Sequence, residues 1–271
     1  MSSSTLHTDP VLLERDGPVA ILRLNLPERL NPLALALQER LRARLAELSA
    51  DRSVRALVLT GVGKAFCVGA DLSGMQPPSD GRSLGEWTRE TMVALSNRLV
   101  EDLRGLPFPV LAAVNGPCAG AGVGLALAAD IVLTARSAYF FLSFMPRLGI
   151  VPDLGSTWFL ERFVGRPRAV AISLLGDRIS GELAAQWGLV WACVDDAQLE
   201  SQALAMAQRL ASLPAHAAQE IRQVFDHAAQ QDLPAQLRLE AERQRELIDR
   251  PEFHEGVQAF LQKREPRFPP R

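Results

Sequence analysis

The chain of 271 residues carries 29 Lys and Arg against 31 Asp and Glu, a formal net charge of −2. This length predicts one large domain with an ample core, and the charge balance offers no basic surface for nucleic acid. Three cysteines without C-x-x-C spacing indicate a reducing compartment and argue against a disulfide scaffold or a zinc site. The longest apolar runs are too short to span a bilayer, and residues 1–17 lack the pattern of a signal peptide. We therefore expect a cytoplasmic protein without nucleic-acid or membrane partners.

Short apolar runs and helical patterns alternate in the first half of the chain. Residues 19–25 and 56–60 predict strands, and between them leucines recur at helical spacing from Leu33 to Leu48. Asn31-Pro32 fits the N-cap and first position of that helix. Residues 84–106 predict another helix. This alternation indicates an α/β core.

A glycine-rich stretch lies at the centre of this pattern. Residues 110–114 predict a buried strand, small residues fill positions 118–124, and residues 125–129 predict a tightly packed helix. Free backbone N–H groups collect at a helix N-terminus, and glycines let a ligand approach them. Small residues also permit close helix–sheet packing, so a binding role and a packing role both remain open at this point.

The composition changes in the second half of the chain. All glycines except Gly256 lie at or before Gly188, and Pro214, Pro234 and Pro251 are spaced like helix starts. The sequence thus predicts a core over residues 1–197 and a helical region over residues 198–271. Its Leu and Ala positions are apolar enough to pack against the core or against a neighbouring subunit.

Six motifs along almost the whole chain match one family in the right order. They are L-N-x-P-E-x-L-N at 24–31, K-A-F-C-V-G-A-D-L at 64–72, A-A-V-N-G-P-C-A-G-A-G at 112–122, G-I-V-P-D-x-G at 149–155, W-G-L-V at 187–190 and E-G-x-x-A-F-x-x-K-R at 255–264. With these motifs the sequence resembles the crotonase family of enoyl-CoA hydratases and isomerases.

The resemblance implies a crotonase (ClpP-like) fold: a spiral core of stacked β-β-α units, with C-terminal helices that build a homotrimer or a dimer of trimers. It implies an acyl-CoA thioester substrate, with coenzyme A as part of the substrate and no resident metal or redox cofactor. The backbone N–H groups of Cys67 and Ala121 match the donors that hold the thioester oxygen in such an oxyanion hole. Matching coenzyme A contacts are Arg29, Lys64, Ala65, Val68, Gly69, Ala70, Asp71, Leu72, Gly120, Phe260 and Lys263.

The acidic residues separate the branches of the family. Hydratases of the family carry one Glu where this chain has Gly124 and another within the segment that reads F-M-P-R at 144–147 here, so both acids are missing. Asp153 lies in a V-P-D-x-G-S-T-W run that resembles the isomerase branch, including the ring-1,2-epoxyphenylacetyl-CoA isomerases of phenylacetate breakdown. One base suffices for an isomerase, and an apolar setting would raise its pKa and basicity. The alternative for Asp153 is an N-cap of the following helix.

The sequence therefore predicts an acyl-CoA isomerase that moves a double bond from the 3- to the 2-position, as in fatty acid metabolism, or that isomerises a ring epoxide. A hydratase that recruits Glu86 or Glu90 is one alternative. A CoA-binding paralogue without catalysis is another. For Asp71 we expect mainly a structural hydrogen bond to the backbone.

Overall fold

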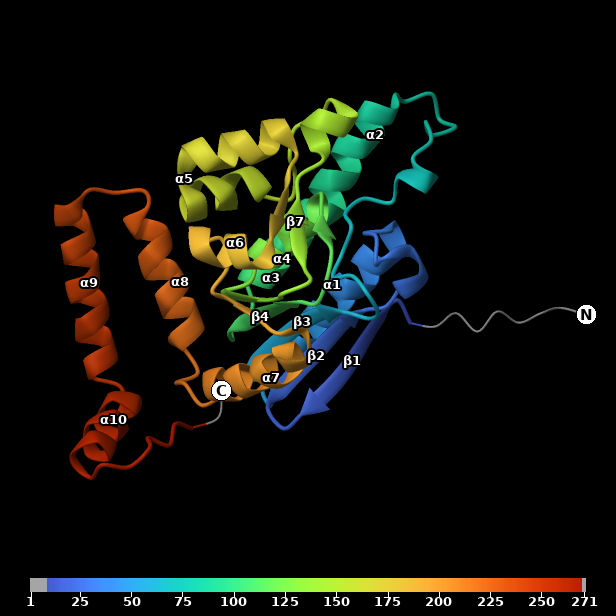
Figure 1. Cartoon of the computed structure of the whole chain (residues 1–271). Coiled ribbons are helices and arrows are strands. Elements are labelled where there is room, and N and C mark those ends of the chain that lie inside the picture. Colours follow the sequence, from blue (N-terminus) through green and yellow to red (C-terminus); the bar gives the residue numbers. More distant parts are fainter. Residues whose placement is uncertain (1–8, 270–271) are drawn as a thin grey trace, which may run out of the picture.

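The computed structural model describes residues 9–269; residues 1–8, part of the segment used above against a signal peptide, and residues 270–271 lie outside the described chain. Within 9–269, one sheet has six strands in the order β1-β2-β3-β4-β6-β9, antiparallel between β1 and β2 and parallel elsewhere (Figure 1). A second sheet over the same residues has the order β5-β7-β8. The strands are β1 (Val11–Asp16), β2 (Val19–Leu24), β3 (Ala56–Gly61), β4 (Val110–Val114), β5 (Cys118–Ala119), β6 (Ile131–Ala135), β7 (Tyr139–Phe141), β8 (Arg178–Ser180) and β9 (Ala192–Val194).

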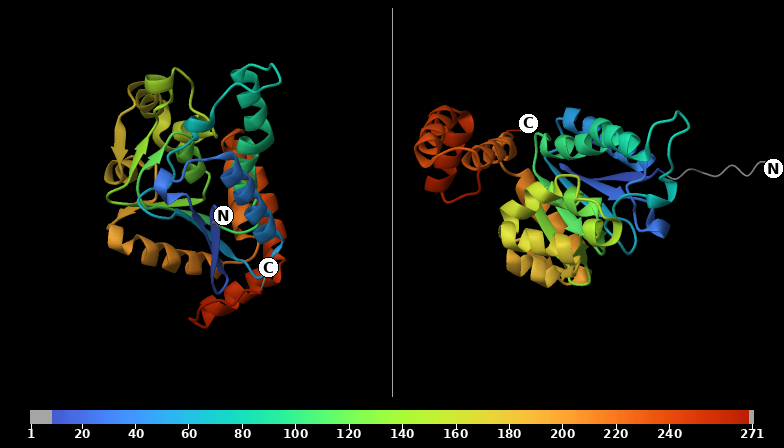
Figure 2. Two further views of the ribbon diagram at one scale, coloured as in Figure 1. Left: turned by 90° about the vertical axis from the view of Figure 1, so that its right-hand side faces the viewer. Right: turned by 90° about the horizontal axis from the view of Figure 1, so that it is seen from above.

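The helices cover both sides of the larger sheet. They are α1 (Leu35–Ala50), α2 (Leu84–Thr91), α3 (Asn97–Arg104), α4 (Ala121–Leu127), α5 (Ser156–Leu175), α6 (Gly181–Trp187), α7 (Leu199–Ala211), α8 (Ala217–Ala228), α9 (Leu233–Ile248) and α10 (Pro251–Leu261). Helix α1 packs against β1 and α3, and α7 packs against β3 and β4. Figure 2 shows α1 and α7 on opposite sides of the sheet. Every residue of β3 and β4 is buried for this reason, which confirms the predicted α/β core.

The leucine pattern of α1 faces the core as predicted, but the start of this helix was placed wrongly. Its N-cap is Ala34, not Asn31. Asn31 has a φ of 56° and is fully buried. Its side chain accepts a hydrogen bond from Leu26 N and donates to the Val62 and Ala65 carbonyls. Asn31 thus ties the loop after β2 to the loop after β3 and has no side-chain atom left for capping.

The predicted helix over residues 84–106 is present in three parts. Between α2 and α3 the backbone widens into a single π-helical turn, η3 (Met92–Ser96). A second π-helical turn, η4 (Phe144–Leu148), follows β7. Such turns in proteins often lie at functional sites.

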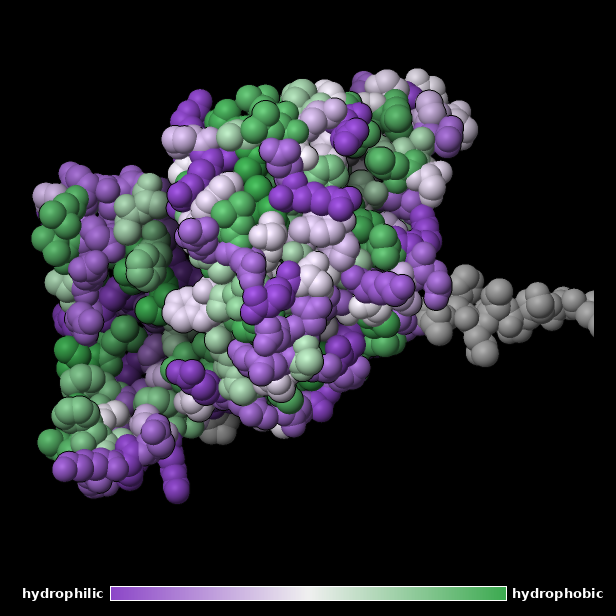
Figure 3. Space-filling view, viewed as in Figure 1, coloured by the Kyte–Doolittle hydropathy of each residue, from purple (hydrophilic) through white to green (hydrophobic). Residues whose placement is uncertain are grey.

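The C-terminal helices α8, α9 and α10 project from the core (Figures 1 and 2). Pro234 and Pro251 lie in the first turns of α9 and α10 as predicted, whereas Pro214 lies in a turn before α8. Large apolar side chains on these helices are exposed, among them Ile221, Phe225, Leu233, Leu237, Phe260 and Leu261. Figure 3 shows hydrophobic residues gathered on this part of the surface. The division of the chain at residue 197 stays a prediction.

Candidate active site

A cavity of about 740 Å³ lies beside the loops that follow β3 and β4. Those loops form one wall, the start of α1 with α2 and η3 forms a second, and the segment from η4 to α5 forms a third. The predicted site residues that line the cavity are Val68, Ala70, Asp71, Leu72, Gly120, Ala121 and Asp153. The structure therefore brings together residues that lie up to 85 positions apart in the sequence, from Val68 to Asp153.

The two backbone loops meet at Gly69. This residue has a φ of 89°, and a Cβ added to it would lie 2.9 Å from the Ala119 carbonyl oxygen and 3.0 Å from Ala121 N. Only glycine permits both this conformation and this approach. Gly69 thus sets the contact between the two loops and brings the neighbouring Ala70 to Ala121.

Two backbone N–H groups on this wall are available to a ligand. Ala121 is the first residue of α4, where a helix leaves its N–H groups unpaired. Among the described residues, neither Ala70 N–H nor Ala121 N–H has a backbone acceptor. Both residues line the cavity. A pair of fixed amides at one wall has the composition of an oxyanion hole.

Cys67 lies elsewhere, in contradiction to the expectation that its N–H faces the substrate. Cys67 N–H donates to the Pro117 carbonyl at 3.3 Å, and the residue is fully buried in a β-bridge with Cys118. It is absent from the cavity wall. Burial raises the pKa of the Cys67 thiol to about 12, so this side chain stays protonated.

Asp153 lies on the loop before α5 and lines the cavity on the wall formed by η4 to α5. Its Oδ1 is buried and has no hydrogen-bond partner among the described residues. Burial raises the pKa of this carboxyl from 3.8 to about 6, against a smaller lowering by a hydrogen bond from its own backbone N–H. The capping alternative is wrong, because Gly155 occupies the N-cap position of α5 and no side chain caps the helix.

Gly124, the position that matches the first hydratase acid, has no room for a side chain because the loop that carries Asp153 packs against it. A Cβ at Gly124 would lie 2.4 Å from the Leu154 carbonyl oxygen and 2.9 Å from the Leu154 Cβ. Leu154 is buried and has a φ of 47°, an uncommon value for this residue type. The missing side chain at Gly124 therefore allows Leu154 to pack on α4, and this packing holds Asp153 at the cavity.

The candidate coenzyme A contacts fall into two groups. Arg29 is half-exposed and pairs with Asp71 at 2.5 Å, and Ser73 donates to the same Asp71 oxygen through its hydroxyl and its N–H. The Ser73 hydrogen bond and then Arg29 hold the pKa of Asp71 below its usual range. The expected structural hydrogen bond between the Asp71 side chain and the backbone is confirmed, with Ser73 N–H as the donor. Lys64 is exposed, whereas Ala65 is buried and its carbonyl accepts from Asn31.

Phe260 and Lys263 form the second group, and within a single copy of the chain neither residue lines the cavity. Phe260 lies on α10, is 83 % exposed, and lines a different hollow with Phe253 and Val257. Lys263 follows α10 and is exposed. Figure 1 shows α10 and α2 at opposite ends of the molecule.

Glu86 and Glu90, the acids considered for a hydratase, are used elsewhere. Glu86 closes a capping box with Ser83 at the start of α2. Glu90 pairs with Arg82. Neither residue lines the cavity.

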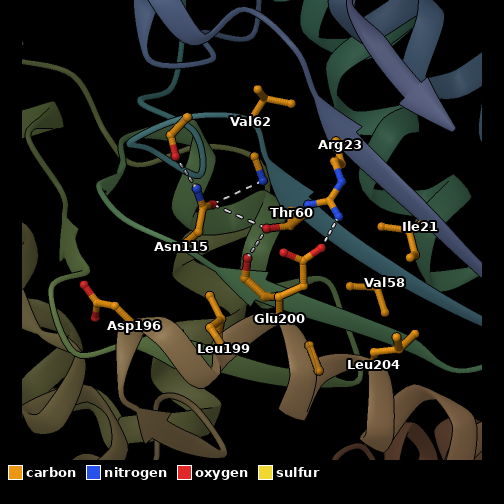
Figure 4. Close-up of a pocket in the computed structure, with 14 residues that line it drawn as sticks. Ile21, Arg23, Val58, Thr60, Val62, Asn115, Asp196, Leu199, Glu200 and Leu204 are labelled. Atoms are coloured by element: carbon orange, nitrogen blue, oxygen red, sulfur yellow. Dashed lines mark hydrogen bonds and ion pairs between the residues drawn. The ribbon is translucent and has the colours of Figure 1, made fainter. Parts of the chain in front are cut away.

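A second cavity of about 350 Å³ lies between the sheet and α7 (Figure 4). Its polar side chains have partners in the protein: Arg23 pairs with Glu200, and Thr60 donates to the Ala113 carbonyl. Asn115 accepts from Gly61 N and donates to the Gly63 carbonyl. These bonds fix the ends of β3 and β4, and they leave this cavity without a free catalytic group among the described residues.

Comparison with known proteins shows the family of the chain. The family described as Enoyl-CoA hydratase/isomerase matches residues 14–271. The chain belongs to this family, the crotonases. It is 42 % identical over 260 residues to the 1,2-epoxyphenylacetyl-CoA isomerase of Escherichia coli, covering 95 % of this chain and 97 % of the relative. It is 43 % identical over 250 residues to a protein of Rhodobacter capsulatus named "Probable enoyl-CoA hydratase", covering 92 % and 94 %.

Solved structures of crotonases share the fold. An enoyl-CoA hydratase from Bacillus anthracis superposes with a TM-score of 0.87 at 33 % identity, covering 96 % of this chain and 98 % of that one. An enoyl-CoA hydratase from Polaromonas sp. JS666 gives 0.88 at 31 % identity, covering 96 % and 99 %. The crotonase fold and the enzymatic nature predicted from the sequence are confirmed. Within residues 9–269, no helix is both long and apolar enough to cross a membrane.

Proposed function

We propose that this crotonase isomerises an acyl-CoA thioester, with Asp153 as the single acid–base group. One observation carries the proposal: within the described chain, the cavity wall holds two carboxylates, and Arg29 already pairs with Asp71. Asp153 is half-buried, and its Oδ1 is buried without a hydrogen-bond partner among the described residues. A carboxylate that loses its hydration becomes a stronger base, as proton abstraction from carbon requires.

In the proposed reaction Asp153 removes a proton from C2 of a 3-enoyl thioester. The electron pair of the broken C–H bond enters the conjugated system, and negative charge develops on the thioester oxygen. The Ala70 and Ala121 N–H groups donate to that oxygen. The Asp153 carboxyl then returns the proton to C4, which leaves a 2,3 double bond and restores the enzyme.

A ring-epoxide thioester is the second substrate class, favoured by the 42 % identity to the 1,2-epoxyphenylacetyl-CoA isomerase. A hydratase has less support, because water addition needs an acid and a base, and Glu86 and Glu90 lie outside the cavity. The alternative of a CoA-binding paralogue loses support because the relatives bear the names of enzymes.

We further propose that α8, α9 and α10 assemble the chain into a homotrimer or a dimer of trimers. The exposed apolar side chains of these helices support this assembly. Phe260 and Lys263 would then reach coenzyme A from a second copy of the chain, since α10 lies far from the cavity of its own. Analytical ultracentrifugation measures the mass directly, and a monomer at micromolar concentration would contradict the proposal.

The test of the reaction follows the ultraviolet absorbance of the conjugated thioester after mixing the protein with a 3-enoyl-CoA or a ring-epoxide thioester. Asp153→Asn should lower kcat by about 10²- to 10⁴-fold. Asp71→Asn is the matched control, a carboxylate in the same cavity, and should raise KM more than it lowers kcat. A product one water heavier by mass would instead identify a hydratase, and no turnover of either thioester would refute the proposal.

A further inference from the structure

The wall of the cavity formed by α1 contains a buried glutamine that the proposed reaction does not use. Gln38 is 5 % exposed and lines the cavity. Its Nε2 donates to the Leu33 carbonyl at 2.8 Å. Its Oε1 is buried and has no hydrogen-bond partner among the described residues. A buried acceptor without a hydrogen-bond partner is costly, so a structural role explains the Nε2 group of Gln38 but not its Oε1.

The orientation of the Gln38 amide follows from its partner. A carbonyl oxygen only accepts hydrogen bonds, so the NH₂ group must face Leu33 and Oε1 must point away from it. Turning the amide around would place two acceptors against each other. The side chain is therefore fixed with its acceptor free for another group.

Ser96 provides a second polar group on the same side of the cavity. It is 7 % exposed, lines the cavity and ends the π-helical turn η3, which packs against α1. Its hydroxyl does not bond to Gln38 Oε1, which has no partner. The apolar side chains Met75, Trp87, Met92 and Leu148 also line the cavity. Its other neutral polar residues, Thr88, Thr91, Asn97 and Ser143, are less buried. Gln38 and Ser96 are thus the two buried polar side chains on the described wall of this cavity.

We infer that Gln38 and Ser96 form a subsite for a hydroxyl on the acyl group, beyond the carbons that react. A hydroxyl has one donor and two lone pairs, so it can donate to Gln38 Oε1 and accept from Ser96 Oγ. This inference rests on the proposed function only in placing the acyl group of a CoA thioester in this cavity. It narrows the substrate class to hydroxylated acyl-CoA thioesters.

The pantetheine amides of coenzyme A are another source of a donor. Their N–H groups could donate to Gln38 Oε1 and their carbonyls could accept from Ser96 Oγ, so depth in the cavity has to separate the two sources. Gln38 and Ser96 are also more deeply buried than Arg29 and Asp71, whose side chains are 49 % and 19 % exposed. The acyl group is the innermost part of the ligand. The burial of Gln38 and Ser96 therefore favours an acyl hydroxyl over a pantetheine amide as their partner.

The test uses saturated thioesters, which cannot isomerise. Titration calorimetry measures Kd for a series of acyl-CoA thioesters and for the same thioesters with one hydroxyl at successive carbons from C4 outward. At least one hydroxylated member should bind the wild type about tenfold or more tightly than its parent. Gln38→Met and Ser96→Ala should each remove most of that preference. Gln236→Met is the matched control, since Gln236 is 8 % exposed but lies on α9, and it should keep the preference.

Each outcome separates the alternatives. If the wild type binds each hydroxylated thioester as tightly as its parent, the subsite is refuted. A preference for the hydroxylated thioester that remains in both Gln38→Met and Ser96→Ala would refute it as well. If Gln38→Met weakens all thioesters equally, its acceptor binds pantetheine and the hydroxyl subsite is wrong. If Gln38→Met does not fold, the preference of the wild type and its loss in Ser96→Ala still test the subsite. A clear preference together with failed isomerisation would leave the subsite standing and refute the proposed reaction alone.

Discussion

Replacement of Asp153 by Asn should stabilise the protein at neutral pH while removing its activity. The folded protein keeps the half-buried Asp153 carboxyl with no partner for its buried Oδ1, and its pKa is about 6 instead of 3.8. Ionising such a group costs about 3 kcal/mol of folding free energy, the equivalent of a pKa difference of about 2. Asn cannot ionise and avoids this cost.

The pH dependence gives the prediction its sign. Well below its unfolded pKa of 3.8 the Asp153 carboxyl is protonated in both the folded and the unfolded chain, and the cost vanishes. Between pH 4 and pH 6 the unfolded chain releases the proton first, so the wild type loses stability as the pH rises. Above pH 6 the full cost applies. The gain from Asp153→Asn should therefore grow from near zero at pH 4 to about 2–3 kcal/mol at pH 8.

Urea unfolding of both proteins at pH 4, 5, 6, 7 and 8, followed by circular dichroism, measures this difference. Other carboxylates titrate in the same range, but they do so equally in both proteins and cancel in the difference. The measured quantity is the change in the variant's advantage with pH, which also removes the constant cost of burying an amide. A pH-independent difference, or an advantage that shrinks as the pH rises, would refute the assignment of Asp153 as a desolvated carboxyl.

Three further predictions concern the rate and the glycines. If Asp153 is the base, kcat/KM should fall about tenfold per pH unit well below pH 6, and a flat profile from pH 5 to 8 would exclude it. Both Gly17 and Gly69 have a positive φ, but only at Gly69 would an added Cβ meet other atoms within 4 Å. In chemical denaturation, Gly17→Ala should lower the free energy of unfolding by about 1–2 kcal/mol, and Gly69→Ala should lower it by more. Gly124→Ala should lower kcat and cost about 1–3 kcal/mol by displacing Leu154, whereas Gly256→Ala, with open space around it, should stabilise α10 by up to about 1 kcal/mol. Equal effects of Gly69→Ala and Gly17→Ala, or of Gly124→Ala and Gly256→Ala, would contradict the close packing around Gly69 or Gly124.

Much of the fold could be predicted from the sequence because local patterns and long-range packing agree. The leucines of α1 recur at helical spacing and face the core, and the apolar runs of β3 and β4 are buried on both sides. The motif order along the chain then identified the family. The start of α1 was wrong because Asn31, a good cap by residue type, is used to connect two loops.

The candidate site was predicted less completely, since the direction of a backbone N–H depends on its partner across space. Cys67 and Ala70 lie in one motif, and only the bond from Cys67 to the Pro117 carbonyl distinguishes them. Gln38 was missed because a glutamine within an amphipathic helix is ordinarily a solvated residue. The motif of Asp153 directed attention to this residue, and the structure places it at the cavity wall; its role as the base stays a prediction.

The contact between Gly124 and Leu154 limits which substitutions this cavity can accept. The Leu154 carbonyl occupies its place above α4 only because position 124 has no side chain. A glutamate introduced at position 124 would therefore have to displace the loop that carries Asp153. A single substitution there would disturb the Asp153 loop and would not add a second carboxylate to an intact cavity. To combine the two carboxylates requires coordinated changes in the helix and the loop.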